Sequence, residues 1–137
     1  MTINIRWKQR FEHFVAAILQ LEEALSAHAN HPTNTLYPMA VIQSFEFTYE
    51  LSWKTLKDYL TLNGVQASLP KETIKLAFKH SLIDNGQEWI NMLEDRNFLS
   101  HTYTSQASKD AIQRITTIYI DLLRQLKTTF EKRYAEE

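Results

Sequence analysis

The chain contains no cysteine, and its 137 residues include only two glycines and three prolines. Without thiols it can form neither a disulfide framework nor a thiolate metal site, which suits a reducing compartment. Gly64 and Gly86 are too few and too isolated to make a phosphate-binding loop or a dinucleotide fingerprint. So few breakers over this length favour long, uninterrupted helices.

Neither sign of charge dominates, since 15 Lys and Arg residues stand against 16 Asp and Glu residues. A net charge of −1 argues against a protein that holds nucleic acid by bulk electrostatics, so any RNA contact must be local. No stretch approaches the ~18 uninterrupted apolar residues of a membrane span, and the N-terminal residues lack the apolar run of a signal peptide. We therefore expect a cytoplasmic protein with no membrane contact.

Apolar residues recur at spacings of three and four, which is the pattern of amphipathic helices. A first long helix carries one seam from Trp7 to Leu25 and ends near residues 30–34. A second helix runs from about Pro38 to Leu60, and the pair at residues 63–64 supplies its C-terminal stop.

The rest of the chain predicts three further helices. A short third helix begins at Pro70 and stops around residues 84–86, and a fourth runs from about Gln87 to Leu99 or Ser100. After a polar break over residues 102–108, a long last helix carries apolar residues from Ile112 to Leu126, and its charged tail, residues 131–137, is expected to fray. Together these segments predict an all-α, up-and-down bundle of about five helices with a four-helix core, in one domain spanning residues 1–137.

Near the end of the predicted fourth helix lie three side chains that could act together on a phosphate: Arg96, His101 and Tyr103. Arg96 falls on the apolar stripe of that helix, between Met92 and Leu99. A guanidinium keeps its charge, so on an apolar face it needs a carboxylate, a phosphate or a second subunit. With no metal, a histidine can accept the proton of a ribose 2′-hydroxyl while an arginine stabilises the charge on the phosphorane.

Geometry leaves the joint action of Arg96 and His101 open. On an unbroken helix a five-residue step turns the side chain by roughly 140°, so the two would face different ways. They converge if the helix breaks before His101, which the hydroxylated residues around it favour, or if two protomers pair their fourth helices. The alternative is structural: Arg96 pairs with Asp95, Glu94 or another carboxylate, His101 caps the helix, and Tyr103 is a half-buried packing ring.

Metal catalysis is not expected. His28 and His31 alone among the five histidines stand at helical spacing, and they straddle a helix end, so we expect solvated loop residues. Glu94 and Asp95 diverge by about 100° on a helix and cannot clamp one ion. Phe98, nearly opposite Arg96, is an aromatic on a polar face and indicates a partner surface.

Three segments resemble a known family: residues 43–60 (QSFEFTYELSWKTLKDYL), 70–78 (PKETIKLAF) and 89–103 (WINMLEDRNFLSHTY). They resemble the nucleotidyltransferase substrate-binding proteins of the HEPN superfamily, the group that includes the HepT toxins. The family's signature, an arginine, four residues, a histidine, one residue and a tyrosine, is complete from Arg96 to Tyr103. The resemblance implies a bundle that dimerises, with Arg96 and His101 of both protomers lining a shared cleft.

The resemblance also implies a partner, a minimal nucleotidyltransferase encoded next door that uses ATP and magnesium in its own active site, and no cofactor in this chain. It implies a metal-independent ribonuclease acting on tRNA, silenced when the partner transfers AMP to Tyr103. In that reading Arg96 and His101 are catalytic, Tyr103 is the acceptor, and Asn97 and Asp95 support the site. The alternative within the same family is a non-catalytic subunit that binds a nucleotide or substrate for the partner enzyme.

Overall fold

A computed structural model describes residues 2–136, with side chains described for residues 5–136. Helices α1 (Thr2–Asn30), α2 (Leu36–Leu62), α3 (Pro70–Lys79) and α4 (Gly86–His101) are followed by a continuous C-terminal run of α5 (Ser105–Arg114), the π-helical turn η1 (Ile115–Tyr119) and α6 (Ile120–Glu136). No strand occurs within the described residues. Counting the C-terminal run as one helix, the described residues form five helices, and the all-α prediction is confirmed.

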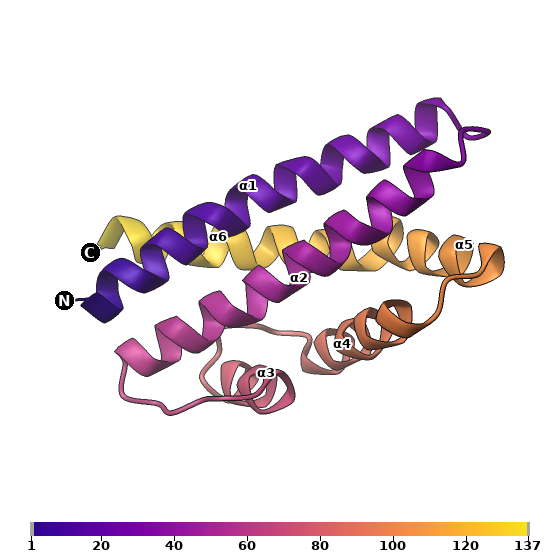
Figure 1. Cartoon of the computed structure of the whole chain (residues 1–137). Coiled ribbons are helices and arrows are strands. Elements are labelled where there is room, and N and C mark those ends of the chain that lie inside the picture. The colour runs from indigo at the N-terminus through magenta and orange to yellow at the C-terminus, as the bar shows by residue number, and fades with distance from the viewer. Residues whose placement is uncertain (1, 137) are drawn as a thin grey trace.

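Helices α1 and α2 run in opposite directions, and the C-terminal run returns behind them (Figure 1). The shorter helices α3 and α4 lie below α2 in that view, and both chain termini lie at the same end. No helix within the described part of the chain is long and apolar enough to cross a membrane.

The core is built from the apolar seams that the sequence shows. Trp7, at the start of the α1 seam, is fully buried, and its ring centroid lies 5.0 Å from that of Tyr59 on α2 and 5.4 Å from that of Phe130 on α6. Aromatic rings bury large apolar areas and pack favourably at such distances, so this cluster holds α1, α2 and α6 together at one end of the bundle. Every helix contributes buried side chains to the same hydrophobic cluster.

Helix ends agree with the sequence only in part. Gly64, with a positive φ of 82°, ends α2 as predicted, because glycine adopts this conformation without strain. The third helix stops earlier than predicted, at Lys79, where Ser81 takes a positive φ of 62° and the Leu82 amide bonds back to the Ala77 carbonyl at 2.9 Å. This turn closes the helix although no glycine or proline marks it.

The last helix is longer than predicted at both ends. It begins at Ser105 because the Thr104 hydroxyl accepts the Ala107 amide proton at 3.1 Å and so caps it. Its tail, predicted to fray, is helical to Glu136. The Tyr134 hydroxyl donates to Glu12, and Lys8 Nζ lies 4.9 Å from the centroid of the Tyr134 ring, so contacts with α1 hold the tail in place.

Candidate active site

Helix α4 runs unbroken to His101, and Thr102 is the first extended residue after it, so the predicted break before His101 is wrong. The Ser100 hydroxyl lies 3.0 Å from the Arg96 carbonyl and 3.0 Å from Glu46 Oε2, so it finds its acceptors while remaining in the helix. Since the helix continues, Arg96 and His101 point about 140° apart. One copy of the chain therefore does not bring these two side chains onto one face.

Arg96 faces α2, where a carboxylate lies within ion-pair distance. Its Nη2 lies 2.9 Å from Glu50 Oε1, and its Nη1 donates to Asn97 Oδ1 at 3.1 Å. Its Nε is buried and has no hydrogen-bond partner among the described residues. Glu50 also lies 3.3 Å from Lys54 Nζ, so its charge is shared between two cations. Arg96 thus forms the ion pair of the structural alternative, and its buried Nε–H lacks a partner among the described residues.

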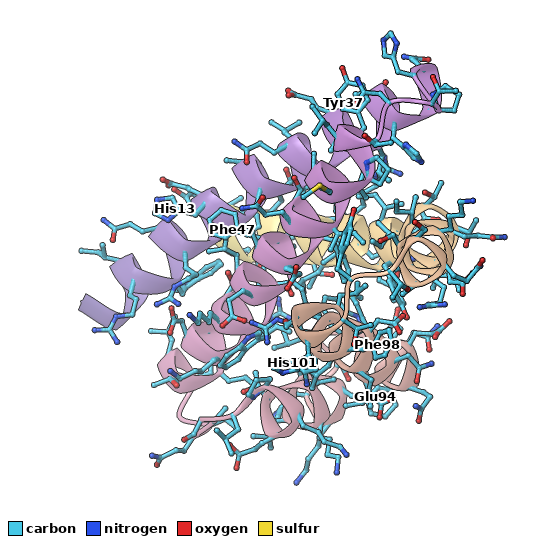
Figure 2. All side chains as sticks on the ribbon, turned by 45° about the vertical axis from the view of Figure 1, so that its right-hand side comes forward. His13, Tyr37, Phe47, Glu94, Phe98 and His101 are labelled. Atoms are coloured by element: carbon cyan, nitrogen blue, oxygen red, sulfur yellow. The ribbon has the colours of Figure 1, made fainter. Side chains whose placement is uncertain are left out.

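His101 lies on the opposite, exposed side of α4. Glu94, Phe98 and His101 follow at spacings of four and three, so they form one stripe, and all three are exposed. Figure 2 labels them together on this helix. Phe98 is 52% exposed, so this stripe presents apolar area to solvent; Phe47 and Phe78 are exposed to a similar extent elsewhere on the surface.

Asp95 is engaged in a different contact, between α4 and the C-terminal run. It accepts from Arg114 Nε at 2.6 Å, from Arg114 Nη2 at 3.1 Å and from the Tyr119 hydroxyl. The hydrogen bond with Asp95 raises the pKa of Arg114, while burial and then the bond to Asp95 raise the pKa of Tyr119. The two side chains on which Asp95 depends were not singled out from the sequence, since they lie 19 and 24 residues further on.

Tyr119 ends the π-helical turn η1, and its ring stacks on Phe45 with centroids 5.7 Å apart. A π-helical turn widens the helix locally, and such turns frequently accompany functional sites. Here the turn lies in the segment that carries Tyr119 to Asp95, so it helps to fix α4 against the rest of the bundle.

Tyr103 lies in the short extended link between α4 and α5 and is 55% exposed. The other five tyrosines are buried or half-buried: Tyr37, Tyr49, Tyr59, Tyr119 and Tyr134. Burial raises the pKa of Tyr49 and Tyr119 well above the ordinary value, which disfavours their use as nucleophiles at neutral pH. Tyr103 is therefore the most exposed of the six phenols.

The two closely spaced histidines behave differently. His31 lies exposed in the loop, as predicted. His28, also expected to be a solvated loop residue, instead belongs to α1, and its Nδ1 is buried without a hydrogen-bond partner among the described residues. Among all the residues that the structure describes, no group of three or more His, Asp or Glu side chains is placed to hold a metal ion.

Fold and motif together define an all-helical protein of the class associated with nucleotidyltransferases. Residues 9–132 match the family described as "Nucleotidyltransferase substrate binding protein like", and the chain belongs to this family. A curated relative, the Probable ribonuclease HepT of Haemophilus influenzae, is 32% identical over an alignment of 94 residues; the match covers 63% of this chain and 64% of that protein. A crystal structure from Thermus thermophilus superposes with a TM-score of 0.64 at 28% identity, covering 77% of this chain and 94% of that one.

Proposed function

We propose that this chain is a metal-independent endoribonuclease, the toxin half of a two-component system whose nucleotidyltransferase partner silences it by attaching AMP to Tyr103. The observation that carries the proposal is the complete Arg96, His101 and Tyr103 motif around the C-terminal end of α4, with His101 and Tyr103 exposed. A relative named as a probable ribonuclease adds support.

The cleavage step uses groups that this chain carries. The 2′-hydroxyl oxygen of a ribose attacks the adjacent phosphorus and His101 accepts the hydroxyl proton. The bond from phosphorus to the 5′-oxygen of the next nucleotide breaks, and that oxygen takes a proton from solvent. The products are a 2′,3′-cyclic phosphate and a 5′-hydroxyl end. Arg96 stabilises the extra negative charge of the phosphorane, for which its planar array of N–H donors is suited.

The site needs two copies of the chain in this proposal. Within one copy Arg96 turns towards α2 and His101 turns outward, so they do not meet on one substrate. In the proposed dimer, Arg96 of one protomer and His101 of the other come together around one phosphate. The exposed ring of Phe98 would supply apolar contact area at that interface.

The charge and the size of the AMP group attached to Tyr103 explain how the modification silences the nuclease. In the modification the Tyr103 phenolic oxygen attacks the α-phosphorus of ATP, the bond to the β-phosphate breaks, pyrophosphate leaves, and the phenolic proton passes to solvent. ATP and magnesium are expected in the partner's own active site. The product is a negatively charged phosphodiester two residues from His101, which repels and excludes an RNA phosphate.

The test is to treat the purified chain with its partner and ATP and then to assay tRNA cleavage. We expect intact mass to rise by one or more AMP units and cleavage to fall in step, while Tyr103→Phe gains no mass and keeps its activity. Loss of activity without added mass, or added mass on Tyr103→Phe, contradicts the proposal.

One observation favours a second candidate, a non-catalytic subunit that presents a nucleotide or substrate to the partner enzyme. Glu50 already neutralises Arg96 in the single chain, and the description of the matching family is of substrate binding. In that case the wild-type chain cuts no RNA at all, and Arg96→Ala weakens only ligand binding or the activity of the partner.

A further inference from the structure

A cavity of about 540 Å³ lies at the end of the bundle where the α1–α2 hairpin meets the start of α5. The last turn of α1, the loop after it, the first turn of α2 and the first two turns of α5 line it, and Tyr103 stands among the lining residues. Cavities that hold small molecules measure ~300–1,000 Å³. The proposed acceptor tyrosine therefore borders a space large enough for a nucleotide.

The lining combines apolar and polar groups in a way that suits a nucleotide. Leu36, Met39 and Ile112 supply apolar surface, which suits the flat face of a base. Lys109 and Ser105 belong to the first turns of α5, where the positive end of the helix dipole favours an anion. No carboxylate is present among the lining residues, so nothing there repels a phosphate.

Two buried polar atoms of the cavity residues lack a partner. Ser108 is 4% exposed, and neither its hydroxyl oxygen nor the Nδ1 of His28 has a hydrogen-bond partner among the described residues. Native proteins leave few such groups unsatisfied, because a buried polar atom that loses its water partners without gaining others is destabilising. Both residues line the cavity, so a polar ligand there would supply the missing partners.

We propose that this cavity holds the nucleotide that Tyr103 carries after modification, with the base against the apolar wall and the phosphodiester at Lys109 and the start of α5. This inference rests on the proposed modification of Tyr103. Held in this way, the adduct is shielded from solvent and from enzymes that would remove it. The silenced state is then a docked state, in which the nucleotide stays in the cavity beside Tyr103.

Photo-crosslinking locates the attached nucleotide directly. The full chain is modified by its partner with an azido-adenosine triphosphate, checked by intact mass with Tyr103→Phe as control, irradiated, and mapped by peptide mass spectrometry. We expect adducts on the peptide of residues 28–39. No mass on Tyr103 refutes the proposed function and this inference with it. Modified Tyr103 with crosslinks only outside the cavity, or with none, refutes the inference alone.

A charge reversal gives a second, independent readout. Lys109→Glu places a carboxylate at the proposed phosphate position, and Lys132→Glu makes the same change near the far end of the C-terminal run. Both residues are exposed, so both variants should fold. After modification by the partner, we expect a phosphodiesterase to strip the nucleotide from Lys109→Glu about fivefold faster than from wild type, equivalent to ~1 kcal/mol, and from Lys132→Glu at the wild-type rate. Equal rates for the two variants overturn the proposal.

Discussion

Replacing Asp95 by asparagine removes the charge that ties α4 to the C-terminal run. The bidentate pair with Arg114, whose side chain is 40% exposed, contributes ~0.5–1 kcal/mol after solvent screening. The bond from the buried Tyr119 hydroxyl to a charged acceptor contributes ~1.5–2 kcal/mol. We therefore expect Asp95→Asn to lower the free energy of unfolding by ~2–3 kcal/mol, which for a chain of this size lowers Tm by roughly 6–9 °C.

Thermal and urea unfolding followed by far-ultraviolet circular dichroism measures this loss. The matched control is Asp110→Asn, an exposed acid on α5 whose hydrogen bond is a local one from Gln106, and its cost should stay below ~0.5 kcal/mol. In a double-mutant cycle, Asp95→Asn and Tyr119→Phe should not add, because both remove the same bond. Equal losses for the two aspartates, or strict additivity with Tyr119→Phe, would refute this account of Asp95.

Three further predictions concern stability and binding. His101→Ala alters an exposed side chain at the end of α4, so urea titration should show a change within ~0.5 kcal/mol; a larger loss means that the ring packs in the fold. Glu50→Gln removes the charge that competes with RNA for Arg96, so a fluorescent tRNA should bind about threefold or more tightly by anisotropy, and unchanged or weaker binding argues against the RNA site. Because the folded chain raises the pKa of Tyr49 and Tyr119, it keeps protons that the unfolded chain releases above pH ~10, so the free energy of unfolding should fall as pH rises past that value. Urea titrations across that range should show a shallower fall for Tyr49→Phe, and an identical slope would contradict the assignment.

Sequence patterns within a few turns were sufficient to predict where a helix forms and, at a glycine, where it ends. The seam that begins at Trp7 predicts α1 because its period matches the helix, and the glycine at position 64 predicts the end of α2 because of its conformational freedom. The end of α3 was missed, since a serine adopts the positive φ there. The prediction of a frayed tail was wrong because Tyr134 is held by Glu12, which is 122 residues away in the chain.

At the candidate site, the sequence predicted that Arg96 requires a partner, but it did not predict which residue that partner is. An arginine on an apolar stripe requires a partner, yet no local pattern chooses among the available carboxylates, and Glu50 lies 46 residues away. The match appears only once the two helices are packed together: Glu46 and Glu50 stand four apart on α2 and meet Ser100 and Arg96, four apart on α4. The expected break before His101 failed because the Ser100 hydroxyl bonds to the carbonyl four residues earlier without ending the helix.

Cleavage of a tRNA pool in excess EDTA tests the central claim most directly. The purified chain, with Tyr103 shown by intact mass to be unmodified, is compared with His101→Ala at equal concentration. The account predicts cuts that persist in EDTA, carry 2′,3′-cyclic phosphate ends and vanish in the variant, while circular dichroism shows both proteins folded. Intact tRNA with the unmodified wild-type chain, or cleavage that survives His101→Ala, would contradict it.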